Sequence, residues 1–179
     1  RVLVVGGSQG AHAVNEAMME AAPIIARVPG GIDVTHQTGE VDVDIVRGAY
    51  RRAGIDAQVE CFFDLMDEEM HAADLVVCRA GATTLAEVAA AGRPSLIVPF
   101  PHAAYDHQRS NAQVMVDAGS AELVDEIDLS TCFANRLLDL IADRERLQAM
   151  SQAAFGLARP NAAETIVDRI TELLKLSTS

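Results

Sequence analysis

The chain has 179 residues, half of them apolar, and a formal net charge of −12 from 26 acidic and 14 basic side chains. This length and apolar content suffice for one domain with a sizeable core, which excludes a disordered chain. The acidic balance argues against non-specific binding of nucleic acid and against direct docking on anionic lipid.

Three cysteines lie far apart in the sequence and form no CxxC pair. Cys61 and Cys78 fall in apolar segments, so we interpret both as small core residues, and Cys132 stands alone. Unpaired cysteines are typical of a reducing compartment, which predicts a cytoplasmic protein.

Six short apolar segments predict strands, and helical patterns separate them. The predicted strands are residues 1–5, 32–38, 57–63, 74–79, 94–100 and 121–124. The predicted helices are residues 11–27, 42–52, 64–73, 83–91, 108–118, 130–141, 144–157 and 160–176. This alternation predicts an α/β fold with a Rossmann-like, doubly wound parallel six-stranded sheet. No second domain boundary is visible in residues 1–179. Because the chain begins within an apolar strand, we expect a piece of a longer protein.

A glycine-rich loop, residues 6–10 (GGSQG), joins the first strand to the first helix. Strand, glycine-rich loop and helix form the context of a phosphate-binding loop, and Ser8 adds a hydroxyl. The spacing matches neither G-x-G-x-x-G nor a P-loop, so NAD and ATP are not favoured. The alternative is a tight turn that binds no ligand.

Asp42 and Asp44 open the second predicted helix. An Asp-x-Asp pair can hold a divalent metal that bridges a diphosphate. Negative charge also stabilises a helix start, and we favour that interpretation.

Residues 74–87 predict a buried strand, a tight loop at Gly81 and a helix that begins near Thr83. Thr83 or Thr84 can cap that helix through its hydroxyl. The free N–H groups and the helix dipole favour a diphosphate, and Glu87, one turn later, suits a ribose diol. Together they predict a nucleotide-diphosphate site. The alternative is an ordinary turn with a capped helix.

The loop 101–108 follows the fifth predicted strand and carries His102, Asp106, His107 and Gln108. Loops after parallel strands lie at the carboxyl edge of the sheet, where ligands bind. No Cys or third His lies at metal-ligand spacing, so zinc is not favoured. The alternative is a polar loop that faces water.

Several motifs together resemble the C-terminal half of the MurG family of peptidoglycan glycosyltransferases. The motifs are residues 6–11 (GGSQGA), 36–39 (HQTG), 78–87 (CRAGATTLAE), 90–94 (AAGRP), 98–100 (VPF) and 107–112 (HQRSNA). They cover nearly the whole chain in order and at the right spacings. The resemblance implies the C-terminal lobe of a two-lobed GT-B glycosyltransferase, which binds the donor UDP-N-acetylglucosamine. The N-terminal lobe, which the sequence lacks, would hold the lipid I acceptor, the membrane-facing patch and the catalytic base.

The resemblance also implies roles for individual residues. Ser8 would contact the phosphates or the sugar, the main chain at Phe63 would contact uracil, and Glu87 would bind the ribose hydroxyls. Gln108 would bind the sugar hydroxyls, with Asn111 close by. The full implied donor site is Ser8, Gln9, Gly10, Phe63, Arg79, Gly81, Ala82, Thr83, Thr84, Leu85, Ala86, Glu87, Gln108 and Asn111.

The implied reaction is an inverting displacement in which the acceptor 4-hydroxyl attacks the anomeric carbon and UDP leaves. No essential metal or other cofactor is implied, because helix N–H groups can stabilise the departing diphosphate. The full-length protein would lie on the cytoplasmic face of the cell membrane, and the isolated chain would be inactive. The alternatives are an enzyme similar to the UDP-sugar 2-epimerases and a non-catalytic sugar-nucleotide binding module.

In the family the last helix, here about residues 160–176, crosses back towards the other lobe. Its apolar stripe runs from Ile166 to Leu174. We expect this stripe to be partly exposed and to drive self-association.

Overall fold

The computed structural model describes residues 1–7, 10–103 and 106–176. Its core is one six-stranded parallel sheet in the order β3-β2-β1-β4-β5-β6. The strands are β1 (Val2–Val5), β2 (Val34–Gln37), β3 (Gln58–Glu60), β4 (Leu75–Cys78), β5 (Ser95–Ile97) and β6 (Ala121–Leu123). The predicted Rossmann-like fold is confirmed. The strand order reverses between β1 and β4, and crevices for ligands form where it does so.

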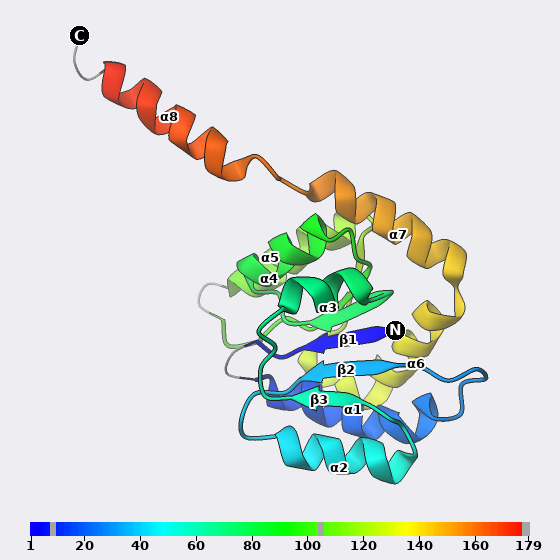
Figure 1. Cartoon of the computed structure of the whole chain (residues 1–179). Coiled ribbons are helices and arrows are strands. Elements are labelled where there is room, and N and C mark those ends of the chain that lie inside the picture. The colour runs from blue at the N-terminus through cyan, green and yellow to red at the C-terminus, as the bar shows by residue number, and fades with distance from the viewer. Residues whose placement is uncertain (8–9, 104–105, 177–179) are drawn as a thin grey trace.

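Helices cover both faces of the sheet. They are α1 (His12–Ile25), α2 (Val43–Ala53), α3 (Met66–Ala72), α4 (Ala82–Ala90), α5 (His107–Asp117), α6 (Leu129–Ala142), α7 (Arg144–Leu157) and α8 (Ala162–Leu176). A short 3-10 helix, Glu126–Asp128, precedes α6. Figure 1 shows α1, α2 and α6 below the sheet and α3, α4 and α5 above it.

Two apolar clusters hold these layers together, one on each face. Alternate residues of β1 divide between them: Val2 and Val4 pack towards α1 and α6, and Leu3 and Val5 pack towards α4 and α5. A strand that is apolar on both faces can be buried only between two helical layers. The run of four apolar residues in β1 therefore requires helices on both faces of the sheet.

Two local predictions were wrong. Strand β3 ends at Glu60, and Cys61, expected in the core, is exposed because it follows the end of an edge strand. Helix α4 begins at Ala82 with Gly81 at its N-cap, and neither Thr83 nor Thr84 caps it. Asp42 and Asp44 do lie at the start of α2, as predicted, but the side chain of Asp42 makes no capping hydrogen bond.

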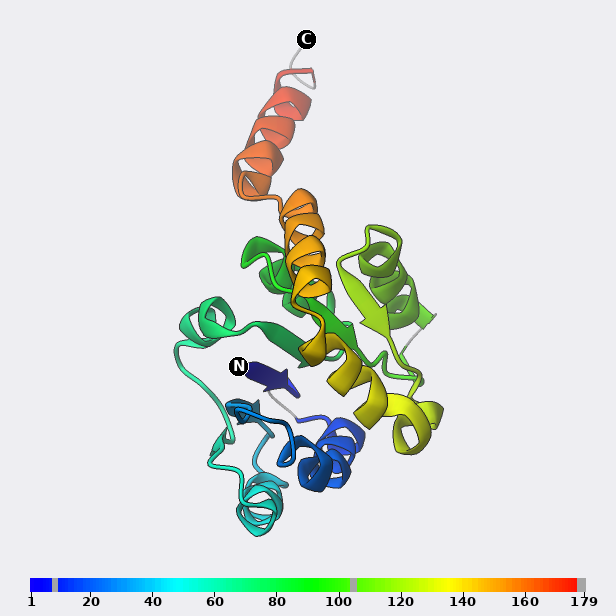
Figure 2. The same cartoon turned by 90° about the vertical axis from the view of Figure 1, so that its right-hand side faces the viewer.

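The last helix projects away from the sheet (Figures 1 and 2). Five large apolar residues along it are 52–67% exposed: Ile166, Val167, Ile170, Leu173 and Leu174. The predicted exposure of this stripe is confirmed. Among the described helices, none combines the length and apolar composition that a membrane span requires.

Candidate functional site

An open cavity of about 560 Å³ lies at the carboxyl edge of the sheet, at the switch between β1 and β4. Segments after β1, β4 and β5 meet there, together with the 3-10 helix. The lining residues are Val5, Gly6, Gly7, Gly10, Ala11, His12, Ala13, Arg79, Gly81, Thr84, Phe100, Gln108 and Glu126. The cavity is in the range typical of small-molecule sites.

The glycine-rich loop packs closely against the end of β2. A Cβ atom at Gly10 would lie 2.3 Å from the carbonyl oxygen of Thr38, and Gly10 has a φ of +75°. The N–H of Gly6 donates to the carbonyl of Gln37 at 3.0 Å. Only glycine fits at position 10, and its small size brings loop backbone to the cavity wall. Two predicted site residues, Ser8 and Gln9, lie outside the described residues.

The start of α4 forms a second wall. Gly81 and Thr84 line the cavity, and the described residues provide no side-chain cap for this helix. Its first-turn N–H groups therefore lie beside the cavity, where they and the helix dipole favour an anion. The side chains of Ala82, Thr83, Ala86 and Glu87 are exposed, whereas Leu85 is buried in the core. Leu85 can therefore offer a ligand no side chain.

Two side chains of α5 hold the loop between β4 and α4. The Oε1 atom of Gln108 accepts hydrogen bonds from the N–H of Ala80 at 3.1 Å and of Phe100 at 3.0 Å. The Nδ2 atom of Asn111 donates to the carbonyl of Ala80 at 3.2 Å. The acceptor end of Gln108 is thus occupied by backbone, so the donor end is the part that suits a sugar hydroxyl.

Arg79 is fixed on the cavity wall. Its guanidinium lies 2.5 Å from the carboxylate of Glu126, donates to the carbonyls of Val98 and Pro99, and lies 5.4 Å from the ring centre of Phe100. These partners tie together the loops after β4 and β5 and the 3-10 helix. Arg79 therefore holds these loops together beside the cavity, and Glu126 balances its charge.

Phe63 lies apart from this cavity. Its side chain is buried, and its N–H donates to Oε1 of Gln37 at 3.1 Å. A ligand that reads the main chain here would have the carbonyl group of Phe63 as the remaining partner.

Sequence reasoning missed His12 and its contact with Asp42. His12 lines the cavity as the first residue of α1, and its Nδ1 lies 2.8 Å from Oδ2 of Asp42. An imidazole two residues after a glycine-rich loop was the available sequence signal. Asp44 is exposed and pairs with Arg47, so the two aspartates point to different partners. In the described part of the chain no group of three or more His, Cys, Asp or Glu residues could hold a metal ion.

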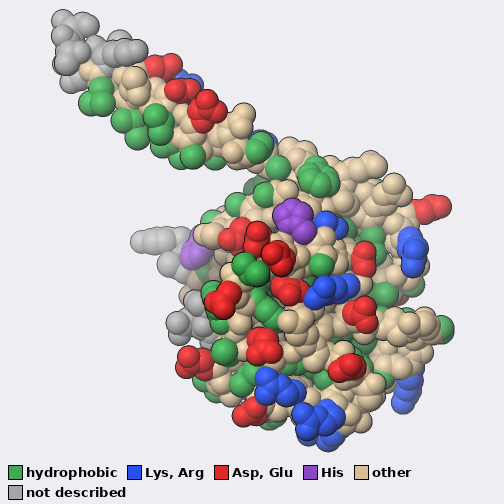
Figure 3. All heavy atoms as spheres, viewed as in Figure 1, with side chains coloured by type: hydrophobic (Ala, Val, Ile, Leu, Met, Phe, Trp, Pro, Cys, Tyr) green, Lys and Arg blue, Asp and Glu red, His purple; other side chains and the backbone are tan. Residues whose placement is uncertain are grey.

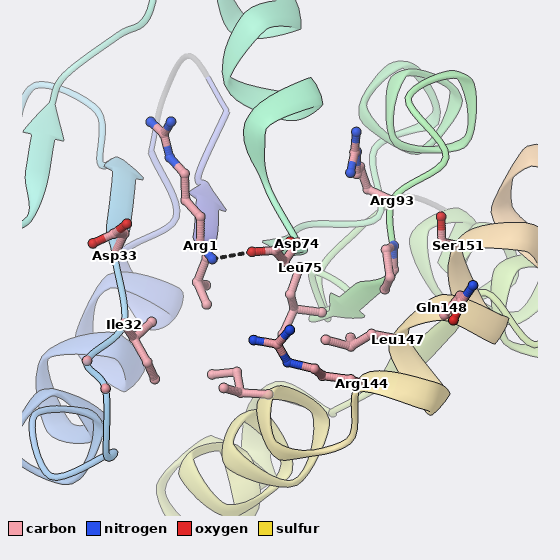
Figure 4. A pocket seen from close by; sticks show the side chains of 15 residues that line it. Arg1, Ile32, Asp33, Asp74, Leu75, Arg93, Arg144, Leu147, Gln148 and Ser151 are labelled. Atoms are coloured by element: carbon pink, nitrogen blue, oxygen red, sulfur yellow. Dashed lines mark hydrogen bonds and ion pairs between the residues drawn. The ribbon is translucent and has the colours of Figure 1, made fainter.

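A second cavity of about 470 Å³ opens at the opposite, amino edge of the sheet (Figure 4). Figure 4 shows the guanidinium groups of Arg1, Arg93 and Arg144 held apart rather than converging. Arg1 is bonded to Thr35 and Glu69, and Arg93 to two backbone carbonyls. Because ligands of doubly wound sheets bind at the carboxyl edge, the cavity between β1 and β4 is the better candidate.

Comparison with known families decides the assignment. The glycosyltransferase family 28 C-terminal domain matches residues 1–166. The chain belongs to this family. One curated relative, the UDP-N-acetylglucosamine–N-acetylmuramyl-(pentapeptide) pyrophosphoryl-undecaprenol N-acetylglucosamine transferase of Geobacter metallireducens, is 46% identical over 170 residues. That match covers 94% of this chain and 47% of the relative, so the family 28 domain spans about half the length of this relative.

Solved structures agree with the family assignment. The crystal structure of Acinetobacter baumannii MurG matches with a TM-score of 0.87 and 36% identity, over 96% of this chain and 49% of that one. A putative UDP-N-acetylglucosamine 2-epimerase from Listeria monocytogenes matches with a TM-score of 0.69 and 17% identity, over 97% and 45%. The second likeness shows a shared fold alone. The family match and the MurG structure confirm the C-terminal lobe of a GT-B glycosyltransferase.

Proposed function

We propose that this chain is the donor-binding lobe of an inverting N-acetylglucosaminyltransferase that converts lipid I to lipid II in peptidoglycan synthesis. The donor is UDP-N-acetylglucosamine. The observation that carries the proposal is the cavity at the switch between β1 and β4, in a chain 46% identical to a transferase of that name. Residues 1–179 act as one donor domain, and a further lobe of the same protein supplies the acceptor site.

The walls of the cavity suit the parts of a nucleotide sugar. Backbone of the glycine-rich loop and the first turn of α4 supply N–H groups for the diphosphate. Glu87, exposed one turn into α4, accepts hydrogen bonds from the ribose diol. The amide nitrogen of Gln108 donates to a sugar hydroxyl. Arg79, paired with Glu126, holds the loops around the phosphates.

In the proposed reaction the 4-hydroxyl of the acceptor attacks the anomeric carbon of N-acetylglucosamine. The bond from that carbon to the β-phosphate oxygen breaks, and UDP leaves with the electron pair. Negative charge grows on the diphosphate as the bond breaks, so N–H dipoles aimed at it stabilise the transition state more than the ground state. The base that removes the hydroxyl proton would belong to the other lobe.

The acceptor named for the relatives is carried on undecaprenol, so the full-length protein would meet it at the cytoplasmic face of the membrane. The surface in Figure 3 carries many acidic side chains, and the chain has a net charge of −12. Such a surface is repelled by anionic lipid. We therefore assign membrane contact to the rest of the protein. Helix α8, with its exposed apolar stripe, would pack on that other lobe.

Donor binding can be measured by calorimetric titration with UDP and with 2′-deoxy-UDP. We expect the chain to prefer UDP, and Glu87→Ala to lose about tenfold in UDP affinity, because hydrogen bonds to a carboxylate contribute about 1.5–3 kcal/mol. The variant should also lose its preference for UDP over 2′-deoxy-UDP.

The matched control is Glu145→Ala, an exposed carboxylate in the first turn of α7. Its affinity should equal that of the unmodified chain. An unmodified chain that binds neither nucleotide at millimolar concentration would overturn the proposed function. A Glu87→Ala variant that keeps the full preference for UDP would remove Glu87 from the ribose site.

A further inference from the structure

A connected chain of hydrogen bonds runs from the core to the edge of the donor cavity. The hydroxyl of Tyr50 lies 2.9 Å from Nδ1 of His36, and Nε2 of His36 lies 3.0 Å from Oδ1 of Asn15. Nδ2 of Asn15 donates to Oδ2 of Asp42 at 2.8 Å. The last link joins the same Oδ2 atom to Nδ1 of His12 at 2.8 Å.

The direction of each bond follows from the chemistry of its ends. Burial lowers the pKa of His36 to about 3, so its ring is neutral and has one N–H group. Oδ1 of Asn15 can only accept, so Nε2 of His36 carries that hydrogen and Nδ1 accepts from Tyr50. Asn15 is thereby held with its amide nitrogen towards Asp42, and a second bond from Nδ2 to the carbonyl of Thr38, 3.0 Å, fixes it.

Asp42 is therefore an ionised carboxylate in a fixed position. Its side chain is 9% exposed. Burial alone would raise its pKa, but the hydrogen bonds from Asn15 and His12, with the charge of His12, bring the pKa below its ordinary value. A buried carboxylate aimed at an imidazole fixes the orientation of that ring and favours its protonated form.

His12 presents its other nitrogen to solvent. Its side chain is 68% exposed, and Nε2 lies 3.3 Å from the carboxylate of Glu16, itself 56% exposed. A contact at this distance between exposed side chains is weak. The carboxylate of Glu16 can therefore be displaced from Nε2 of His12 by a ligand anion in the cavity. His12 lies at the start of α1, among the glycines that line this cavity.

We propose that His12 is a donor-site residue that contacts the diphosphate of the nucleotide sugar through Nε2, and that Asp42 is the positioning residue that holds its ring for this contact. The inference rests on the proposed function, which it deepens. The contact is a charge-assisted hydrogen bond to an oxygen of the diphosphate. It becomes stronger as UDP leaves, because the departing diphosphate gains a negative charge.

The contact also makes donor binding depend on pH. The hydrogen bond and charge of Asp42 raise the pKa of His12, burial opposes this slightly, and Glu16 adds to the rise. Across the cavity the other charged groups are Arg79 and Glu126, which pair with each other. The imidazolium therefore persists to a pH above its ordinary pKa of about 6.5, and affinity falls as the pH rises through the raised value.

The test is calorimetric titration of the chain with UDP-N-acetylglucosamine between pH 6 and pH 8.5. Each phosphate of this probe carries one ester and one anhydride bond, so the probe lacks the titration near pH 6 of a terminal phosphate. We expect His12→Gln to weaken binding about tenfold at pH 6, the usual size of one charge-assisted hydrogen bond, and to abolish the pH dependence. Binding of uridine, which has no phosphate, should be unchanged.

Two further variants separate this role from a merely structural one. Asp42→Asn keeps an acceptor for Asn15 and His12 but removes the charge, so the midpoint of the pH dependence should move to lower pH. Glu16→Gln removes the competing carboxylate from Nε2 and should tighten donor binding by about threefold, within the range of exposed ion pairs. A structural role for Glu16 would predict no gain in affinity.

His71→Gln is the matched control, because its imidazole lies on α3 and bonds to the carbonyl of Asp67. It should bind the donor as the unmodified chain does. If the unmodified chain binds the donor and folded His12→Gln binds it equally well at pH 6, the inference is overturned and the proposed function stands. If the unmodified chain binds neither donor nor uridine, the proposed function itself is overturned.

Discussion

Gly10 allows the glycine-rich loop to approach the end of β2 closely at the cavity between β1 and β4. Its φ of +75° lies in the left-handed region, and a Cβ atom there would lie 2.3 Å from the carbonyl oxygen of Thr38. Gly7 has nearly the same φ, +77°, but a Cβ atom there would have no neighbour within 4 Å. Substitutions at Gly7 and at Gly10 can therefore be compared to separate the cost of backbone strain from that of a steric clash.

We expect Gly7→Ala to destabilise the chain by about 1–2 kcal/mol, the cost of a side chain in the left-handed region. Gly10→Ala should add to this the displacement of the loop from β2. For a chain of this size, 1 kcal/mol lowers the Tm by roughly 2–4 °C, so thermal unfolding followed by circular dichroism would distinguish them. Equal Tm values for the two variants would contradict a close contact at Gly10.

The sequence could not predict which side chains of the site bond to one another. The glycine-rich loop, Glu87 and Gln108 were predicted from residue type and position after a strand. Asp42 was interpreted locally, as a helix start, although its partners His12 and Asn15 lie on α1, some 30 residues earlier. A local pattern shows what a carboxylate can do, but the fold decides which hydrogen-bond donors reach it.

At the scale of elements, the periodicity of apolar residues and the composition of each segment predicted where strands and helices lie. All six strands lie within predicted segments. For β1 and β4 the reason is that a strand apolar on both faces has few alternatives to burial. The errors fall at the ends of elements, as in β3 and at the start of α4. There a single hydrogen bond decides the boundary, and side-chain pattern carries little information about it.

Helix α8 is the element whose apolar stripe is exposed in this chain. An isolated helix of 15 residues is marginal in water, and its apolar stripe lies along one exposed side (Figure 3). We expect the chain to self-associate through this stripe, as measured by sedimentation velocity. Ile170→Glu combined with Leu173→Glu should give a monomer.

The control for this prediction is Thr171→Glu, which adds a charge to the same helix at an exposed position outside the apolar stripe. It should leave the association unchanged. A chain that is monomeric at high micromolar concentration before any substitution would contradict the prediction.

At the scale of the whole molecule, the chain would supply the donor side of the proposed reaction. The family 28 domain has a cavity at the carboxyl edge of its sheet, which we propose binds the donor, and the matched relatives are about twice as long. Displacement of UDP needs an acceptor hydroxyl held in line with the leaving group and a base to take its proton. Glu87 and the His12–Asp42 pair are occupied, in our proposals, with the ribose and the diphosphate.

We therefore expect the chain alone to bind UDP-N-acetylglucosamine without transferring the sugar to a lipid I analogue. Adding the separately expressed N-terminal half of the Geobacter metallireducens relative should restore transfer, because closure of the two lobes brings the acceptor hydroxyl to the anomeric carbon. The measurement is radiolabelled sugar in the lipid fraction, with Glu87→Ala as the variant that should lower it. Transfer by the 179-residue chain alone would contradict the proposal that another lobe holds the acceptor site and the base. Donor binding without turnover, after the two halves are shown to associate, would favour a non-catalytic binding module.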